Sequence, residues 1–409
     1  PMPTADSSPL QLFRQRPFAF FWFTRVFTAA GSQMQAVAVS WQIYELTHSA
    51  FDLGMVGLVQ FLPRLALMTV AGNAADRHDR KSVVFLAQVV QAIVLAVLAL
   101  ESVHGHVTRE LIYILVIVSG AARSFEMPTT QALLPTLVSA KALPRAVAMA
   151  ASAMQAATIV SPALGGVLYV LGASSVYGIT ALLFAISALL CTMIKPLVRP
   201  TRLTPTGSSL AYFREGIRFI RTRRAVLGAI SLDLFAVLLG GATALLPIVA
   251  HQLLETGAWG LGLLRSAPAV GALLISLWLA HHPLRHRVGH LMFAAVAVFG
   301  FATIAFALSR SLLLSLLVLA VLGAADMVSV VIRSAFVQLQ TPDAMRGRVS
   351  AVNSVFIGAS NQVGEFESGL TAAAFGTVPS ILIGGLGTLL VAYLWMRAFP
   401  ELRNADTLE

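Results

Sequence analysis

The sequence predicts an all-α integral membrane protein with twelve transmembrane helices. Of its 409 residues, 57% are hydrophobic and only 11% are charged, whereas soluble domains average about 45–50% apolar and about 25% charged residues. The apolar residues form blocks of about 20, the length at which a helix spans a bilayer. Long unbroken apolar runs also argue against a membrane β-barrel, whose strands alternate over roughly ten residues.

Short breaks rich in polar residues, glycine or proline separate the twelve blocks. The polar first 17 residues lead into a block too long for the apolar part of a signal peptide, so we expect this first helix to stay as an anchor. The predicted helices cover residues 18–45, 51–72, 82–101, 110–134, 145–171, 174–194, 225–251, 258–280, 289–309, 311–337, 348–376 and 379–398.

The longest break, residues 195–224, divides these helices six and six. Its second part, LAYFREGIRFIRTRR, places Phe213, Ile217 and Ile220 at helical spacing between arginines. This pattern predicts an amphipathic helix near anionic headgroups, either as a plain connector or as a lipid sensor. The expected domains are a cytoplasmic segment (1–17), a six-helix bundle (18–194), the linker (195–224), a second six-helix bundle (225–398) and a cytoplasmic tail (399–409).

The two halves resemble each other in sequence. Adding 203 to a residue number carries Gly120 onto Gly323 and Gly166 onto Gly369. Weak symmetry of this kind is typical of transporters in which two halves rock about a central site. We therefore expect two pseudo-symmetric six-helix bundles.

The net charge of +10 reflects topology and not a nucleic-acid partner. With both termini on one side, that side's loops and helix ends hold twenty-one of the 28 lysines and arginines, and the opposite side holds only Arg109 and Arg310. This is the positive-inside pattern, so both termini are expected to be cytoplasmic.

The chain shows no signature of an enzyme or of a cofactor. We find no nucleotide-binding P-loop, no zinc motif and no convincing Ser-His-Asp set. Four histidines lie in the wet loop around residues 280–290 without carboxylates or cysteines beside them, so we expect no metal site there. We expect no catalytic residues, no cofactor and no direct use of ATP.

The loop between the second and third helices reads GNAADRHDRK, residues 72–81. It resembles the loop signature of the major facilitator superfamily in Gly72, Asp76, Arg77, Arg80 and Lys81. The glycine permits close helix approach, and the cations hold the loop inside. The resemblance implies that this segment acts as a cytoplasmic latch.

The fifth helix carries a second likeness to the same superfamily. Ser161 and Pro162 precede Gly165 and Gly166, an arrangement similar to the superfamily's antiporter motif, with small residues in place of its early glycines. Close packing and a proline bend predict a hinge. Ordinary packing of small residues is the alternative.

The segment from Gly323 to Gly369, with its TPDAMRGRV stretch, carries the narrowest resemblance. It is similar to the bacterial exporter branch of the superfamily, which includes enterobactin exporters and drug-efflux permeases. The resemblance implies export of a siderophore-like or drug-like compound.

Ten charged residues lie inside the predicted helices. Each costs about 2.5–3.5 kcal/mol at the centre of a bilayer, so each is expected to be paired, hydrated or functional. None lies on helices 3, 6, 9 or 12, which the resemblance implies are lipid-facing. The ten are Arg25, Arg64, Arg123, Glu126, Asp233, Arg265, Asp326, Arg333, Glu365 and Glu367.

Several of these residues are candidates for transport roles. A carboxylate shielded from water can hold a proton at neutral pH and release it when its site opens. The proton-coupling candidates are Glu365, Glu367, Asp233, Asp326 and Glu126. The substrate-cavity candidates are Arg25, Arg123, Arg333, Phe235 and Phe356.

Helical geometry distinguishes between the two glutamates of the eleventh predicted helix. Glu365 and Glu367 lie about 200° apart on an ideal helix, so only one can face a cavity. We predict that Glu365 is the proton site and that Glu367 pairs with a neighbouring helix.

Two charged pairs lie along single helices. Arg123 and Glu126 share a face and could pair directly or serve coupling. Asp326 and Arg333 are two turns apart, so each is expected to meet a partner on another helix.

These patterns predict a secondary transporter of the bacterial inner membrane. The expected mechanism is proton-driven export of an amphipathic organic compound by alternating access. We expect the protein to be a monomer, with the substrate, protons and membrane lipids as its partners. Proton-coupled uptake of a small organic anion and lysophospholipid transport are the alternatives, and a membrane enzyme or scaffold without transport is disfavoured.

Overall fold

The computed structural model describes residues 9–195, 209–282 and 286–406, and every regular element within these ranges is helical. All twelve predicted blocks are helical, so the predicted fold class is confirmed. The long helices are α2 (Arg16–Thr47), α3 (Ala50–Arg77), α4 (Arg80–His104), α5 (Arg109–Leu133), α6 (Leu143–Leu168), α7 (Ala173–Met193), α9 (Arg224–Gly240), α11 (Ala258–His281), α12 (Val288–Leu308), α13 (Leu312–Leu339), α14 (Asp343–Phe375) and α15 (Thr377–Ala398).

Ten of these segments are long and apolar enough to cross a membrane by length and composition alone. The two that are not among the ten, α2 and α14, are interrupted by polar side chains that lower their mean hydropathy, such as Gln33 and Gln35 in α2 and Asn361 and Glu365 in α14.

Local sequence signals set several helix ends. Asp79 caps the N-terminus of α4, where its Oδ2 accepts from the Ser82 amide at 3.1 Å, and Gly105 ends the helix at φ 71°. Thr108 Oγ1 accepts from the Leu111 amide at 3.2 Å at the start of α5. Short polar side chains satisfy free N–H groups at a helix start, and glycine adopts the left-handed conformation at a helix end.

The seventh predicted helix is not continuous, and this part of the prediction is wrong. After α9 ends at Gly240, the chain forms a 3-10 turn η3 (Ala242–Leu245), the short α10 (Leu246–Ile248) and a π-helical turn η4 (Val249–Leu253). Gly241 leaves the helical region at ψ 53°. Pro247 follows and lacks the N–H that a regular helix needs at that point.

The linker helix is confirmed as α8 (Ser209–Thr222). Two short helices, α1 (Pro9–Arg14) and α16 (Pro400–Arg403), and the 3-10 turns η1 (Leu134–Thr136) and η2 (Tyr169–Leu171) were not expected. They lie at the ends of longer helices or next to them, where short helical turns are common.

The internal contacts of the chain form two units. The first unit comprises Pro1–Gln42 and Leu62–Pro205, and the second comprises Ile43–Phe61 and Thr206–Glu409. The end of α2 and the start of α3 therefore pack with the second unit. The domain boundaries expected from the sequence stay a prediction.

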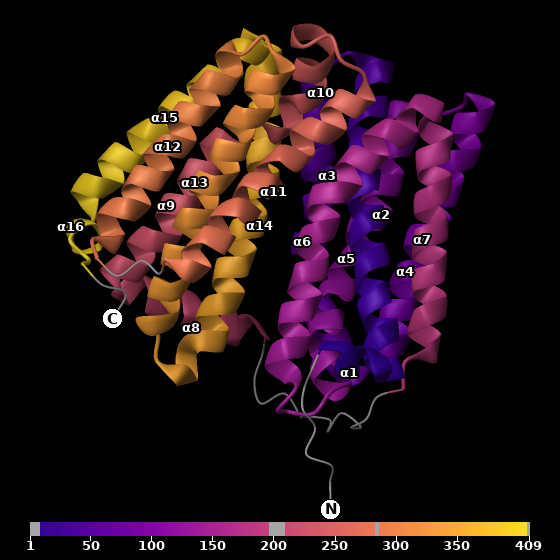
Figure 1. The fold of residues 1–409 in the computed structure, drawn as a ribbon, viewed down its shortest axis with the longest axis horizontal. Coiled ribbons are helices and arrows are strands. Elements are labelled where there is room, and N and C mark those ends of the chain that lie inside the picture. Colours follow the sequence, from indigo (N-terminus) through magenta and orange to yellow (C-terminus); the bar gives the residue numbers. More distant parts are fainter. Residues whose placement is uncertain (1–8, 196–208, 283–285, 407–409) are drawn as a thin grey trace, which may run out of the picture. The chain divides into compact units, whose positions relative to one another are not determined.

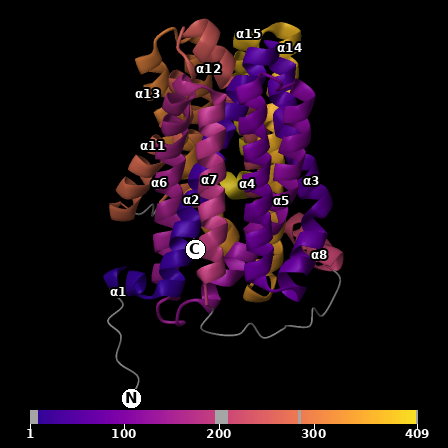
Figure 2. The ribbon, with the colours of Figure 1, turned by 90° about the vertical axis from the view of Figure 1, so that its right-hand side faces the viewer.

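Each unit is a bundle of long helices. In the first unit, α4 packs side by side with α5 and α7 (Figure 2). In the second unit, α12 packs with α13 and α15, and α9 packs with α14 and α15 (Figure 1).

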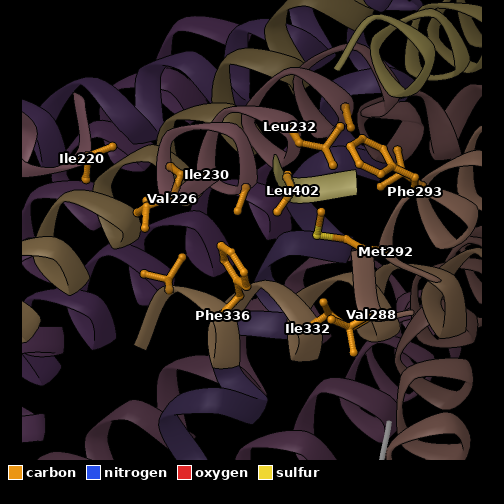
Figure 3. Close-up of a cluster of buried hydrophobic side chains, with 14 of the residues drawn as sticks. Ile220, Val226, Ile230, Leu232, Val288, Met292, Phe293, Ile332, Phe336 and Leu402 are labelled. Carbon is orange, nitrogen blue, oxygen red and sulfur yellow. The ribbon is translucent and has the colours of Figure 1, made fainter. Parts of the chain in front are cut away.

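Apolar side chains fill the interior of the second unit around α9, α12 and α13 (Figure 3). Leu232, Met292 and Phe336 are among the buried members of this cluster. Bulky apolar side chains also stand exposed on α4, α7, α12 and α15, the four helices expected to face lipid. Examples are Leu86, Leu182, Phe301 and Leu386.

Candidate functional site

A buried ion pair joins α9 to α13 inside the second unit. The Arg333 guanidinium contacts the carboxylate of Asp233, and their side chains are only 3% and 9% exposed. This contact confirms the expectation that Arg333 meets a partner on another helix. Two charges out of water are tolerated only when they are paired.

Asp326 lies beside this pair, on the same helix as Arg333. It borders a small cavity of about 10 Å³ together with Asp233 and Ser329, which is room for about one water molecule. The Asp326 carboxyl is repelled by the charge of Asp233 and attracted by the charge of Arg333 when it is ionised. Among the described residues, Asp326 has neither an ion-pair partner nor a side-chain hydrogen bond.

Glu365 on α14 faces the start of α3. A Cβ atom added to Gly57 would lie 2.6 Å from Glu365 Oε2, and one added to Gly54 would lie 3.0 Å from the Cα of Gly369. Two helix backbones come this close only where residues are small. The positive charge of Arg265 on α11 attracts the ionised Glu365 carboxylate from a distance. The two side chains form no direct ion pair in the described ranges.

Glu367 contacts its own helix. Its Oε1 accepts a hydrogen bond from Thr371 Oγ1 at 2.8 Å, one turn further along α14. The expectation that Glu367 pairs with a neighbouring helix is therefore wrong, because a hydroxyl four residues away is already within reach.

A buried polar network surrounds Glu126 in the first unit. Gln88 Nε2 donates to Glu126 Oε1 at 2.9 Å and to Thr28 Oγ1 at 2.8 Å. The hydroxyls of Thr28 and Ser187 lie 3.1 Å apart. The network joins α2, α4, α5 and α7 around one carboxylate.

Arg123 does not form the expected ion pair with Glu126 in the described structure. Its guanidinium instead donates to Gln35 Oε1 on α2 at 3.5 Å, while Gln88 takes up the Glu126 carboxylate. The charges of Arg123 and Arg25 still act on Glu126. Neighbouring helices compete successfully with a partner three residues away on the same helix.

The neutral amides of this region were not among the site residues expected from the sequence. Gln88 and Gln91 are 0% exposed on α4, and Gln91 Oε1 accepts from Ser119. The available signal was the presence of two amides three residues apart in an otherwise apolar block. Such groups are mostly buried with hydrogen-bond partners, and here Gln88 Nε2 and Gln91 Oε1 have partners whereas Gln88 Oε1 and Gln91 Nε2 have none among the described residues.

Two predicted cavity aromatics make ring or apolar packing contacts. Phe235 lies against Trp395, with ring centroids 5.2 Å apart. Phe356 packs on the hydrophobic cluster of the second unit.

In the latch segment, two cations hold the ends of neighbouring helices. Arg80 Nη1 donates to the Ala132 carbonyl at 2.8 Å, near the end of α5, and Lys81 Nζ donates to the Thr192 carbonyl, near the end of α7. Cations favour helix C-termini because free carbonyls and the helix dipole both attract them.

The structure describes the remaining latch residues only in part. The side chains of Asp76 and Arg77 lie outside the described residues. No described atom lies within 4 Å of a Cβ built on Gly72. Within the described part of the chain, no close helix approach is seen at Gly72, and the latch role of this segment stays a prediction.

The predicted hinge lies inside α6. Ser161, Pro162 and Gly166 are buried, and the helix continues through the proline. A Cβ on Gly165 would lie 3.0 Å from the Cα of Met34, so α6 and α2 are in close backbone contact there. Whether this segment moves as a hinge stays a prediction.

Among the residues that the structure describes, no three His, Cys, Asp or Glu side chains gather as a metal site. Of the loop histidines, His282 stacks on Trp278 with ring centroids 4.8 Å apart, and His286 lies 3.7 Å from Asp406.

Twelve long helices in two bundles, with charged and amide side chains buried between helices, define a multi-pass membrane transporter. The chain belongs to the transmembrane secretion effector family of the major facilitator superfamily, whose model matches residues 7–409.

Two similar proteins carry the name enterobactin exporter EntS. The one from Citrobacter koseri is 28% identical over 402 residues, which is 97% of this chain and 95% of that protein. The one from Escherichia coli O1:K1 / APEC is 26% identical over 400 residues, with the same coverage.

Solved transporter structures share the fold. A bacterial homologue of the human lysosomal transporter Spinster superposes with a TM-score of 0.75 at 13% identity, over 95% of this chain and 98% of that one. A mutant of the nucleoside transporter NupG gives a TM-score of 0.72 at 14% identity, over 94% of this chain and 100% of that one. At these identities the likeness shows the fold alone.

Proposed function

We propose that the chain is a proton-driven exporter of a siderophore-like compound in the bacterial inner membrane, working as a monomer with both termini in the cytoplasm. The observation that carries this proposal is the similarity to enterobactin exporters over 97% of the chain. The excess of lysine and arginine on one side supports the orientation.

Asp326 and Glu365 are the proposed proton carriers. Of the five candidate carboxylates, Asp233 is held by Arg333, Glu126 by Gln88 and Glu367 by Thr371. The two that remain have no ion-pair or hydrogen-bond partner among the described residues. Each can therefore gain or lose a proton without a direct ion pair being broken.

The proposed contacts to substrate are the guanidinium groups of Arg25 and Arg123. Arg333 is already engaged by Asp233, whereas the one hydrogen bond of Arg123 within the described ranges is a long one to Gln35. Guanidinium groups suit oxygen-rich anionic or polar compounds, because their planar N–H groups can donate in pairs.

Everted membrane vesicles test direction and driving force together, with enterobactin as the probe. Vesicles that contain the chain are expected to accumulate enterobactin when their interior is made acidic, and to stop when an ionophore collapses the gradient. Accumulation in intact cells, driven by an inward proton gradient, would instead establish uptake and refute export.

Matched variants test the proposed carriers. Asp326→Asn and Glu365→Gln are each expected to abolish accumulation driven by the pH gradient. Glu367→Gln serves as the control and is expected to keep most of it, because this carboxylate already accepts a hydrogen bond within its own helix. If both carrier variants still respond fully to the gradient, the assignment is wrong.

A further inference from the structure

The linker helix α8 uses its apolar side inside the protein. Ile220 is 3% exposed within the hydrophobic cluster of the second unit (Figure 3), and Phe213 and Ile217 pack against the same cluster. A Cβ on Gly216 would lie 2.7 Å from the Arg348 carbonyl oxygen, so α8 also lies directly against α14. Between residues 213 and 220, the apolar side chains of α8 therefore pack mainly on protein.

The one acidic side chain in the described part of α8 forms an ion pair with α14. Glu215 Oε2 lies 3.0 Å from Arg348 Nε of α14. This ion pair adds a polar contact to the apolar docking of the helix. It also leaves the remaining charges of α8 uniformly positive.

Three arginines form an exposed stripe along α8. Arg214, Arg218 and Arg221 are all exposed, and none has an ion-pair partner among the described residues. Their spacing places them within about 60° of one another around the helix and over about 10.5 Å of its length. We call this set the arginine stripe.

The arginine stripe lies next to the start of a membrane span. Only Arg223 separates the end of α8 from the span that begins at Arg224 and ends at Leu253. Arg223 lies over the Phe219 ring, 6.0 Å from its centroid. A residue at the start of a membrane span lies near the headgroup region of a bilayer, so the arginine stripe begins close to that level in the sequence.

We propose that the arginine stripe binds the headgroups of anionic phospholipids. Guanidinium groups bind phosphate through charge-assisted, often bidentate hydrogen bonds. Because the apolar side chains of α8 at residues 213–220 pack mainly on protein, the attraction is mainly electrostatic. It therefore falls as salt screens the charges, unlike the insertion of an amphipathic helix.

Lipid binding to the full chain, purified in a neutral detergent, tests this proposal. A short-chain phosphatidylglycerol is titrated at low and high salt, and bound lipid is counted by native mass spectrometry. The variant Arg214→Gln/Arg218→Gln/Arg221→Gln is expected to bind roughly a hundredfold more weakly at low salt, about fivefold per arginine. High salt is expected to remove most of the difference.

A charge-matched variant provides the control. Arg16→Gln/Lys141→Gln/Lys195→Gln also removes three positive charges, from the first unit, and is expected to bind the lipid about as well as the original chain. Both variants are checked for an unchanged helical circular dichroism spectrum and a monodisperse elution profile.

Three outcomes would overturn the proposal. Equal weakening in both triple variants would show a non-specific effect of net charge. Equal binding of phosphatidylcholine would show that the headgroup charge is not recognised. Full competition by inorganic phosphate at the same phosphate concentration would show a free-anion site instead of a lipid site.

Discussion

Asp233 of α9 and Arg333 of α13 form a buried ion pair in the interior of the second unit. The pair removes two charges from water at once, and each side chain makes the burial of the other tolerable. Asp326 lies beside it across a cavity with room for about one water molecule. The second unit thus holds one satisfied carboxylate and one unpaired carboxylate side by side.

The first prediction concerns this ion pair. Asp233→Ala is expected to lower the free energy of unfolding by about 3–5 kcal/mol, because it leaves the Arg333 guanidinium buried without a partner. Denaturant titration of the detergent-solubilised chain measures the change. Replacing both residues, as in Asp233→Leu/Arg333→Leu, is expected to recover much of the loss.

The control for this experiment is Asp343→Ala. Asp343 pairs with Arg346 at 2.7 Å, but both side chains are exposed, so the expected loss is under about 1 kcal/mol. A loss from Asp233→Ala no larger than this control would contradict the role assigned to the buried pair.

The second prediction concerns the crossing of α3 and α14. Gly57→Ala is expected to destabilise the chain by about 1–2 kcal/mol, because the new methyl group would lie 2.6 Å from Glu365 Oε2 and 3.0 Å from Glu365 Cβ. Adding Glu365→Ala to this variant is expected to cost less than the sum of the two single changes, since the colliding atoms are then gone.

Gly178→Ala is the matched control for this prediction. No described atom lies within 4 Å of a Cβ at Gly178, so the change is expected to stabilise its helix by about 0.5–1 kcal/mol. Thermal unfolding measures the stability of both variants. Equal changes in stability for Gly57→Ala and Gly178→Ala would show that Gly57 and Glu365 are not in close contact.

The third prediction concerns the polar network of the first unit. Gln88→Leu is expected to cost about 1–3 kcal/mol of stability, because Glu126 and Thr28 then lose their common donor. Gln15→Leu, at an exposed position, is expected to change the stability by less than about 0.5 kcal/mol. Thermal unfolding of the two variants tests this, and a Gln88→Leu variant as stable as the original would exclude a structural role for the amide.

The length and position of the long helices could be predicted because they follow from local sequence. Runs of about 20 apolar residues, bounded by residues such as Asp79 at a helix start and Gly105 at a helix end, place the helix boundaries within about five residues, except at Gly240. The break after Gly240 was missed because an apolar run looks the same whether its backbone is α-helical, 3-10 or π-helical.

The partners of the buried charges could be predicted only in part. Sequence spacing identifies which residues share a face of one helix, as for Arg123 and Glu126, but not which side chain a neighbouring helix offers. Instead, Gln35 accepts a hydrogen bond from Arg123, and Gln88 donates one to Glu126. The burial of Asp233 and Arg333 was foreseeable, but their meeting depends on how α9 packs against α13.

The most direct test of the proposed export mechanism is substrate-dependent proton movement by the purified chain. Proteoliposomes that enclose a pH-sensitive dye are loaded with enterobactin and diluted into substrate-free buffer. We predict that enterobactin leaving by way of the chain drives protons in the opposite direction, and that Glu365→Gln and Asp326→Asn abolish this proton movement. Efflux of enterobactin at the full rate without any proton movement would contradict proton-driven exchange.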